Sequence, residues 1–460
     1  MTRIDPNDPR PVHFVGIAGA GMRALAELLA RRGVVVTGCD ANPGATADLQ
    51  ALGIEVARGH SPEHVIGARE LIVTSAMARN HPELERAREL GVPITRRAEA
   101  LGRAVEGGRV VGIAGTHGKT TTTVMTTAAL TSAGLKPTGI AGGRVAEWNG
   151  NLRYASDELF VVEADEYDRS FLTLSPTVAV VTNVEADHLD IYRDLEDITS
   201  TFGRFVREAA AIVICDDDAG ARSLALPASA EVVRYGRLSR DARLVASDVR
   251  SDGHSTTFAV VHDGDPLGEV TLRVPGYHNV QNALAAIGSG LVLGVTLEEM
   301  RGGLLEFRGV DRRFQHLCDV AGVTIIDDYA HHPTEIAATL QAARASYPGR
   351  RIVAAFQPHL FSRTRDFSDA FGAALLAADR VFLTEIYPAR EQPIAGVTSE
   401  LVAAAMARAG RSVDWQGTRS DLAKGLAEFV RDGDVVITIG AGDITRTGPE
   451  LRVRLEGERQ

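Results

Sequence analysis

The segment GIAGTHGKTT, residues 112–121, has the composition of a loop that holds phosphate groups. Gly115 and Gly118 allow backbone N–H groups to point at phosphate oxygens, and a helix that starts there adds a favourable dipole. Lys119 can reach the terminal phosphates, while the hydroxyl of Thr120 can ligate Mg²⁺. Only three of the 49 Lys and Arg residues are lysines, so a lysine here indicates a need for a compact ammonium. The segment predicts binding of a nucleoside triphosphate.

The match to the strict phosphate-loop motif is incomplete. That motif demands a glycine at position 113, where this chain has Ile113. The structural elements of the motif are still expected, because an apolar strand, a glycine turn and a helix follow one another in this segment. The alternative is a glycine-rich turn with an incidental lysine, and the strand–loop–helix context argues against it.

Two further segments place carboxylate and imidazole groups after buried strands. VVEADE puts Glu163 at the end of one apolar run, and VVTNVEADH puts His188 beyond another. A carboxylate at the carboxyl end of a strand beside a phosphate loop is where the metal of a nucleotide is normally held. Mg²⁺ prefers oxygen ligands, so an imidazole at His188 would make Mn²⁺ an acceptable substitute. The neighbouring Asp165, Asp168 and Asp187 fit a solvated loop equally well.

A second glycine loop, GIAGAGM at residues 16–22, nearly matches the dinucleotide-binding fingerprint. Ala18 stands where the second glycine belongs, and Asp40 lies at the distance expected of a ribose-binding carboxylate. Taken alone, this loop predicts a nicotinamide dinucleotide and an oxidoreductase, with a packing turn as the alternative. An oxidoreductase would leave the phosphate loop without a function.

Composition excludes several broad classes of function. The net charge of −11 argues against a broad basic surface that would bind the phosphates of a nucleic acid. Three scattered cysteines form no CxxC pair, which favours a reducing compartment. No apolar run reaches transmembrane length and the N-terminus lacks a signal-peptide pattern. We therefore expect a cytoplasmic protein with no membrane insertion.

Three stretches of the chain each restart a rhythm of strand followed by helix, which predicts an α/β fold with doubly wound parallel sheets. Residues 230–275 instead alternate apolar and polar side chains with Gly and Asp turns, which indicates antiparallel strands. We expect three domains: an N-terminal Rossmann-like domain at 1–106, a central P-loop ATPase-like domain with antiparallel strands at 107–314, and a C-terminal Rossmann-like domain at 315–460.

Nine short segments, spread nearly from end to end of the chain, resemble one known family. In chain order they read GIAGAGM, AGTHGKTTTT, EADEYDRSFL, TNVEADHLD, PGYHNVQNALAA, FRGVDRRFQ, DDYAHHPTEI, FQPHLFSRTRD and EIYPAREQPI. They resemble the Mur ligases of peptidoglycan synthesis, above all the branch that joins L-alanine to UDP-N-acetylmuramate. The resemblance implies ATP and Mg²⁺, and it allows a homodimer. It also implies that ATP phosphorylates the sugar carboxylate to an acyl phosphate, which the amine then attacks.

The resemblance implies a role for each candidate residue. Catalytic roles fall to Lys119, His188 and His331. ATP would contact Gly115, Thr116, His117, Gly118, Lys119, Thr120, Thr121, Asn279, Asn282, Arg313, Asp328 and Tyr329. The metal would be held by Thr120, Glu163 and His188. The UDP-sugar would lie on Gly16, Ala18, Gly19, Ala20, Gly21, Met22, Asp40 and Ser75. The amino acid would contact Tyr329, His331 and His359.

Elementary chemistry supports these roles and leaves alternatives open. The amides of Asn279 and Asn282 match the N6/N7 edge of adenine, although Asn279 also fits a helix N-cap. Arg313 can clamp a phosphate when the third domain closes, or form an ion pair between domains. His331 with a near-neutral pKa could accept the proton of the incoming ammonium, whereas paired histidines also cap helices.

The third domain carries one departure from the family and one discriminating residue. Many Mur ligases have arginine directly after the histidine of FQPH, and this chain has Leu360, so Arg363 or Arg365 would serve the amino-acid carboxylate. A recycling ligase that attaches an intact tripeptide to the same sugar is the nearest alternative. Recycling ligases resemble this chain but carry Phe in place of Tyr329, which favours the single amino acid. Strand-end His and Asp groups disfavour a non-catalytic nucleotide-gated module.

Overall fold

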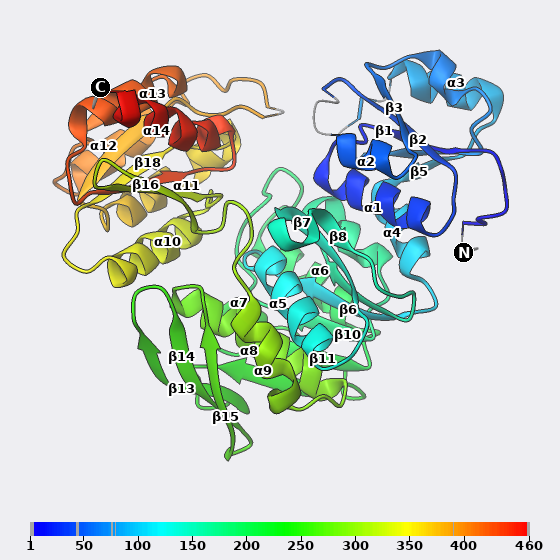
Figure 1. Ribbon diagram of the computed structural model, residues 1–460, viewed down its shortest axis with the longest axis horizontal. Coiled ribbons are helices and arrows are strands. Elements are labelled where there is room, and N and C mark those ends of the chain that lie inside the picture. Colours follow the sequence, from blue (N-terminus) through cyan, green and yellow to red (C-terminus); the bar gives the residue numbers. More distant parts are fainter. Residues whose placement is uncertain (1–3, 43–45, 75–76, 79, 390, 458–460) are drawn as a thin grey trace.

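The structure is a computed structural model that describes residues 4–457 except 43–45, 75–76, 79 and 390, and it contains three sheets, each with its own helices (Figure 1). The predicted three-part α/β architecture is confirmed. We propose unit boundaries near residues 106 and 314, where one sheet gives way to the next. Among the described residues, no helix has both the length and the apolar content needed to cross a bilayer.

The N-terminal unit is a parallel five-stranded sheet in the order β3-β2-β1-β4-β5. Its strands are β1 (Val12–Val15), β2 (Val36–Asp40), β3 (Glu55–Arg58), β4 (Glu70–Val73) and β5 (Ile94–Arg96). Its helices are α1 (Ala20–Arg31), α2 (Ala47–Ala51), the 3-10 helix η1 (Pro62–Val65), α3 (Pro82–Leu90) and α4 (Arg97–Val105). Phe14 packs in the apolar cluster that includes α1, and Val15 packs in the cluster that includes α3, so both faces of β1 are covered.

The central unit is a ten-stranded mixed sheet in the order β15-β14-β13-β12-β11-β10-β6-β9-β7-β8. Its strands are β6 (Arg109–Ala114), β7 (Thr138–Val145), β8 (Gly150–Arg153), β9 (Leu159–Glu163), β10 (Val178–Val181), β11 (Ala211–Cys215), β12 (Glu231–Gly236), β13 (Leu244–Ser251), β14 (Thr256–His262) and β15 (Asp265–Leu272). Its helices are η2 (Ala146–Trp148), η3 (Tyr167–Thr173), α5 (Lys119–Ser132), α6 (Leu195–Val206), α7 (Ala219–Arg222), α8 (Tyr277–Val292) and α9 (Leu297–Glu306).

The antiparallel prediction for residues 230–275 is right for β13, β14 and β15 and wrong for β12. Strand β12 pairs in parallel with both β11 and β13. The chain crosses over through α7 between β11 and β12, so it re-enters the sheet in the same direction. The alternation of apolar and polar residues indicates which side chains are buried. It does not indicate the direction of the neighbouring strand.

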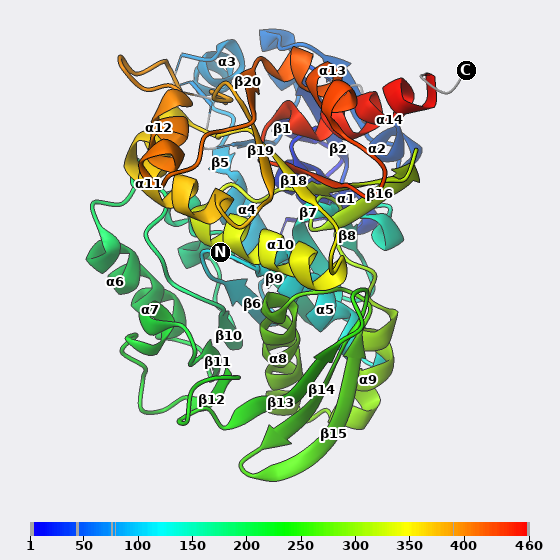
Figure 2. The same cartoon turned by 90° about the vertical axis from the view of Figure 1, so that its left-hand side faces the viewer.

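The C-terminal unit is a six-stranded sheet in the order β16-β17-β21-β18-β19-β20, parallel except for β16. Its strands are β16 (Gln315–Val320), β17 (Val323–Asp328), β18 (Ile352–Phe356), β19 (Arg380–Thr384), β20 (Trp415–Gly417) and β21 (Val435–Ile439). Its helices are α10 (Pro333–Ser346), α11 (Phe361–Leu375), α12 (Glu400–Arg408), α13 (Arg419–Phe429), η4 (Asp443–Arg446) and α14 (Thr447–Gly457). Helix α10 faces α8 of the central unit (Figure 2).

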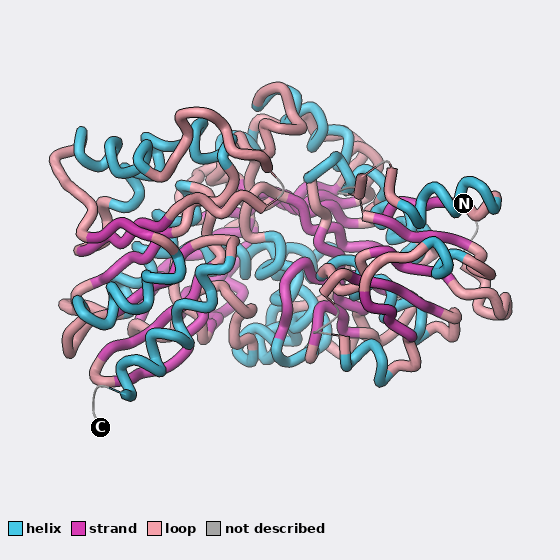
Figure 3. The backbone as a smooth tube through the Cα atoms, turned by 90° about the horizontal axis from the view of Figure 1, so that it is seen from above, coloured by secondary structure: helices cyan, strands magenta, loops and turns pink. Residues whose placement is uncertain are grey.

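Strand order decides which loops meet. In the central sheet β6 lies between β9 and β10 and parallel to both, so the loops that leave their carboxyl ends are neighbours. Seen from above, strands run through the interior of the molecule with helices around them, and the two termini lie on opposite sides (Figure 3). The phosphate loop, the segment that follows Glu163 and the segment that carries His188 therefore converge on one edge.

Candidate active site

The turn between β6 and α5 requires both of its glycines. Gly115 has φ +143° and Gly118 has φ +80°. A Cβ on Gly115 would lie 1.9 Å from the Thr182 hydroxyl oxygen, and a Cβ on Gly118 would lie 2.6 Å from Oδ1 of Asn282. Any larger residue would be strained and would also collide, so the loop keeps its backbone close to β10 and α8.

The Lys119 ammonium is folded into this loop. Its Nζ donates to the carbonyl oxygens of Gly115 at 2.6 Å and Thr116 at 3.2 Å, and to Oε1 of Glu166 at 2.9 Å. Burial opposes the charge, yet Glu166 and the neighbouring carboxylates raise the pKa of Lys119 above its ordinary value. Burial also raises the pKa of Glu166 to about 7, against the pull of Lys119. Glu166 was not among the predicted site residues, although its position in EADE pointed to the same edge.

The predicted metal ligands form two adjoining groups. The Thr120 hydroxyl donates to Oε1 of Glu163 at 3.0 Å, and the Gly142 N–H donates to Oε2 at 2.6 Å. His188 instead lies beside Glu166, with Nε2 3.8 Å from Oε1, and its buried Nδ1 has no hydrogen-bond partner. Burial raises the pKa of Glu163. The buried carboxylates and hydroxyl supply hard oxygen ligands, which suit Mg²⁺.

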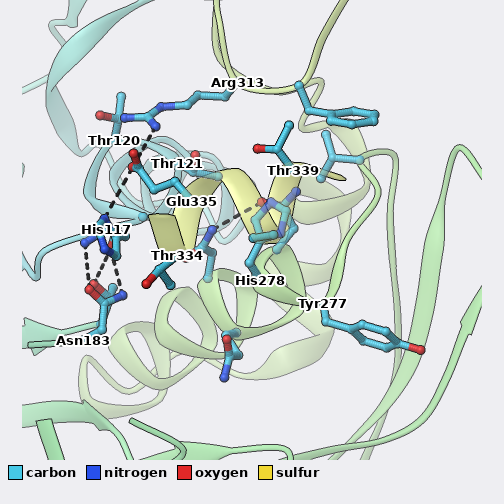
Figure 4. A pocket seen from close by; sticks show the side chains of 18 of the residues that line it. His117, Thr120, Thr121, Asn183, Tyr277, His278, Arg313, Thr334, Glu335 and Thr339 are labelled. Carbon is cyan, nitrogen blue, oxygen red and sulfur yellow. Dashed lines mark hydrogen bonds and ion pairs between the residues drawn. The ribbon is translucent and has the colours of Figure 1, made fainter. Parts of the chain in front are cut away.

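A cavity of about 350 Å³ lies between the central and C-terminal units (Figure 4). Eight of the predicted ATP contacts line it: His117, Gly118, Thr120, Thr121, Asn279, Asn282, Arg313 and Asp328. Four others do not line it: Gly115, Thr116, Lys119 and Tyr329. The guanidinium carbons of Arg312 and Arg313 lie 4.8 Å and 5.2 Å from the centre of the Tyr329 ring.

One wall of the cavity is an ion-pair network that joins the two units. His117 Nε2 lies 3.2 Å from Oε2 of Glu185, and its Nδ1 lies 3.5 Å from Oε1 of Glu335 on α10. The same Glu335 oxygen is 3.3 Å from Arg313 Nη1, and Figure 4 shows Glu335 between the two bases. Burial works against a charged imidazole, but the two carboxylates raise the pKa of His117 to about 9. At neutral pH an imidazolium therefore links the phosphate loop to the C-terminal unit.

Sequence reasoning missed Glu185 and Glu335. Glu185 lies in the same NVEADH segment as His188, and Glu335 lies in the HPTEI segment after His332. The sequence could have pointed to both glutamates, because each lies within four residues of a predicted site residue. Their role depends on a contact between units that are far apart in the chain, which no local pattern records.

The two asparagines of α8 are held against the phosphate loop. Asn279 Nδ2 donates to the carbonyl of Pro275 at 2.7 Å, and Asn282 Oδ1 accepts from the Thr122 hydroxyl at 3.1 Å. The N-cap of α8 is Gly276, so the capping alternative for Asn279 is wrong. His278 also lines the cavity, and burial lowers its pKa to about 4. All three side chains line the same cavity as Asp328.

Asp328 ties the linker to the end of β17. Its Oδ2 accepts from the N–H of Phe314 at 2.8 Å, and its Oδ1 accepts from the N–H of Ala330 at 2.7 Å. Burial raises the pKa of Asp328 to about 6, although Arg313 works the other way. The carboxylate thus holds the chain segment that carries Arg313 over the cavity.

The histidines of the C-terminal unit cluster beside Arg363. The rings of His331 and His359 lie 5.9 Å apart, and His359 stacks on Tyr387 at 5.8 Å. His331 Nδ1 lies 3.0 Å from the carbonyl oxygen of Tyr329, which leaves Nε2 as the acceptor. Burial lowers the pKa of His331 to about 3. The near-neutral pKa expected for this residue is wrong, because its packing between two units was invisible in the sequence.

The two candidate arginines of α11 have separate partners. Arg363 Nη2 lies 2.7 Å from Oδ1 of Asp187 in the central unit, and both side chains are buried. Its Nη1 is 3.4 Å from Nδ1 of His359. Arg365 pairs instead with Asp366 at 2.7 Å and is exposed. Arg363 is thus the arginine beside the histidines, and Asp187 is its buried counter-ion, so the solvated-loop alternative for Asp187 is wrong.

Two neighbours of these side chains have unusual positions. Leu360 is buried and has φ +70°, directly before α11. His332 accepts a 3.4 Å hydrogen bond from the Thr334 N–H at the start of α10, and its ring lies 4.6 Å from that of His117. His332 thus combines helix capping with packing against the phosphate loop.

The N-terminal glycine loop is braced by Asp40. Its Oδ2 accepts from the Ala18 N–H at 3.0 Å, and Gly16 has φ +80°. A Cβ on Gly21 would lie 3.0 Å from Nη1 of Arg97, so a guanidinium covers the start of α1. Sequence reasoning missed Arg97. The predicted contact Ser75 lies outside the described residues.

Known proteins resemble this chain over nearly its whole length. Three family models match successive parts of the chain: Mur ligase family, catalytic domain, at 11–109; Mur ligase middle domain at 113–290; and Mur ligase, glutamate ligase domain, at 312–442. The UDP-N-acetylmuramate–L-alanine ligase of Salinibacter ruber is 43% identical over 455 residues, which cover 98% of this chain and 96% of that protein. That of Acidothermus cellulolyticus is 45% identical over 447 residues, 95% of this chain and 93% of that one.

Solved structures show the same relationship in three dimensions. The UDP-N-acetylmuramate–alanine ligase of Thermotoga maritima superposes with a TM-score of 0.82 at 30% identity, covering 97% of this chain and 99% of that one. A murein peptide ligase from Psychrobacter arcticus gives a TM-score of 0.70 at 25% identity, covering 97% and 98%. From the phosphate loop, the strand-end carboxylates and these full-length matches, we conclude that this chain belongs to the Mur ligase family.

Proposed function

We propose that this protein is an ATP-dependent ligase that joins L-alanine to the carboxylate of UDP-N-acetylmuramate through an acyl phosphate, in the synthesis of a peptidoglycan precursor. One observation carries the proposal. The phosphate loop of the central unit and the strand-end residues of the C-terminal unit line the same cavity, so a nucleotide bound there lies between the units. Full-length relatives at 43–45% identity are named UDP-N-acetylmuramate–L-alanine ligases.

In this proposal the phosphate loop grips the terminal phosphates of ATP. Lys119 turns its ammonium from Glu166 and the loop carbonyls toward the γ-phosphoryl, which passes to the sugar carboxylate as ADP is formed. The charged His117 and Arg313 supply further positive potential on the same side of the cavity. Asn279 and Asn282 also line the cavity, and their amides can pair with the N6/N7 edge of adenine.

Thr120 and Glu163 would hold Mg²⁺ through their oxygen atoms, and His188, which lies beside Glu166, would be a further ligand. When bound, the ion neutralises charge on the phosphates. The unpartnered Nδ1 of His188 leaves that ring free to engage a further group. Mn²⁺ is a substitute that an imidazole ligand would accept.

The amine is received by the C-terminal histidines in this proposal. His331 is neutral at physiological pH, so its free nitrogen accepts a hydrogen bond from the amino group of alanine. His359 and Tyr329 line the same corner, and Arg363 faces it from α11. Attack of the amine on the acyl phosphate forms the amide and releases phosphate.

The N-terminal unit holds the UDP-sugar on the glycine loop, where Ala18 and Asp40 position the backbone and Arg97 can meet the diphosphate. We further propose a cytoplasmic location, where both nucleotides are available. A homodimer is the remaining proposal, and sedimentation of the purified protein tests it.

The deciding experiment measures ADP release with UDP-N-acetylmuramate and one acceptor at a time. Release with L-alanine supports the proposal, and release only with an intact tripeptide would assign the chain to peptide recycling. Omitting the sugar is the control, because ATP hydrolysis without it would not require the acyl phosphate. Turnover of a nicotinamide cofactor in place of ADP release would overturn the assignment.

A further inference from the structure

A second group of ligand-type side chains lies in the N-terminal unit, on the sheet face covered by α3. Its members are His13, Cys39, His60, His64, His81 and Glu83. They come from β1, β2, the turn around η1 and the start of α3. They include every histidine and the only cysteine among residues 1–106. The proposed ligase reaction uses none of them.

Glu83 is the centre of this group and is fully buried. Its Oε1 lies 2.7 Å from His64 Nδ1 and 3.1 Å from Cys39 Sγ. Its Oε2 lies 3.5 Å from His60 Nδ1 and 3.8 Å from His81 Nδ1. Within the described part of the chain, the ion-pair partners of Glu83 are histidines alone. A buried carboxylate without a fixed cation is costly, and a bound divalent ion would compensate it.

His13 supplies an independent sign that a ligand belongs here. Its side chain is 2% exposed, and its Nε2 has no hydrogen-bond partner. Its Nδ1 lies 2.9 Å from the Thr37 hydroxyl, which fixes the direction of the ring. Metal-ligating histidines are held in this way, with one nitrogen hydrogen-bonded and the other directed at the ion.

We propose that His13, Cys39, His64 and Glu83 form a structural site for one zinc ion, with His60 and His81 as outer partners. Their ligand atoms lie within 4.8 Å of one another. Tetrahedral zinc places its ligand atoms roughly 3.3–3.8 Å apart, so no pair must approach by more than about 1.5 Å. The mixed nitrogen, sulfur and oxygen set suits Zn²⁺, whereas Mg²⁺ demands oxygen. The Cys39 thiol now donates to Glu83, and zinc binding releases that proton to solvent and leaves a zinc thiolate.

The position of the site gives the ion a second consequence, which rests on the proposed function. The carbonyl of Cys39 accepts hydrogen bonds from Gly16 at 2.8 Å and Ile17 at 3.1 Å. The next residue, Asp40, braces Ala18. Zinc therefore steadies the base of the loop that holds the UDP-sugar, and its loss should weaken binding of the UDP-sugar more than binding of ATP.

The test uses the full-length protein, purified without chelator and dialysed against excess Mg²⁺. We expect one zinc per chain by elemental analysis, and in cobalt-substituted protein a thiolate-to-cobalt charge-transfer band. Cys39→Ser should lose the band, whereas Cys318→Ser, in the C-terminal unit, should keep it. His60→Asn should weaken cobalt binding by about ten- to hundredfold and still show the band at saturation.

The readout separates this site from the active site. The other candidate group, His117, Glu185 and His332, contains no cysteine and cannot give a thiolate band. Protein without zinc whose cobalt form lacks the band, or a band that survives Cys39→Ser, would overturn the proposal. If the six side chains form only a metal-free hydrogen-bond network, the cobalt form will lack the band while ADP release stays intact. The experiments therefore distinguish a failure of the zinc site from a failure of the proposed function.

Discussion

The buried ion pair between Asp187 and Arg363 is expected to hold the C-terminal unit against the central unit. The two residues are 176 positions apart, and their side chains are 7% and 5% exposed. Both Nε and Nη2 of Arg363 donate to Oδ1 of Asp187, at 3.2 and 2.7 Å. Burial raises the pKa of Asp187, but the guanidinium of Arg363 outweighs that effect. The pKa of Asp187 is therefore lower than its ordinary value.

Replacing Asp187 by asparagine keeps the shape and leaves a buried guanidinium without its counter-charge. Removing one partner of a buried pair typically costs about 3–5 kcal/mol. Since about 1.4 kcal/mol is a factor of ten, the closed arrangement should become less populated by roughly a hundredfold to a few thousandfold. Because Arg363 lies beside His359, we expect this loss in kcat/KM for L-alanine, and ATP affinity should also fall because the ATP cavity lies between the same two units.

A double-mutant cycle with Arg363→Met gives the assay. Each single variant should lose most of kcat/KM, and the double variant should lose little more than the worse single one. The control pair, Asp369 and Arg408, has side chains that are 81% and 62% exposed, so its cycle should show no measurable coupling. Full activity in Asp187→Asn, or strictly additive losses, would refute the reasoning. Scattering measurements with an ATP analogue should also show the variant more extended than the parent.

Three further predictions concern the nucleotide side of the site. Lys119→Ala should abolish ADP formation and leave UDP-sugar binding by calorimetry nearly unchanged; turnover at the parental rate would remove the phosphate-loop assignment. The pKa of His117 is raised from 6.5 to about 9, so its contribution to the contact between units is fully present below pH 6.5 and lost as pH rises through about 9; thermal unfolding across that range should show a decline that His117→Gln lacks. Glu163→Gln should raise the Mg²⁺ concentration needed for half-maximal rate by about tenfold or more, and an unchanged Mg²⁺ dependence would argue against Glu163 as a ligand.

Local signals were enough to identify the phosphate loop. Gly115 and Gly118 occupy backbone conformations that other residues rarely adopt, and Lys119 follows at once as the first residue of α5. Such requirements are written into a few consecutive residues, so the sequence displays them directly. The strand-end position of Glu163 was readable for the same reason, because a buried strand is a continuous apolar run.

The contacts between units were not readable. His117 reaches Glu335, and Asp187 reaches Arg363, only because the loops after β6 and β10 are packed against α10 and α11. The sequence likewise misled about β12 and about the pKa of His331, since strand direction and burial are properties of the neighbours. The zinc ligands gave no spacing motif, because they are contributed by four separate segments.

The sequence alone determined the α/β class, the nucleotide-binding turn and the family resemblance, because each depends on short-range residue order. The tertiary structure decided which charges meet, which are buried and which histidines stay neutral. Electrostatic interactions fall off with distance through space, and chain separation says little about that distance. That is why residues from three separate units had to be placed in space before their chemistry could be assigned.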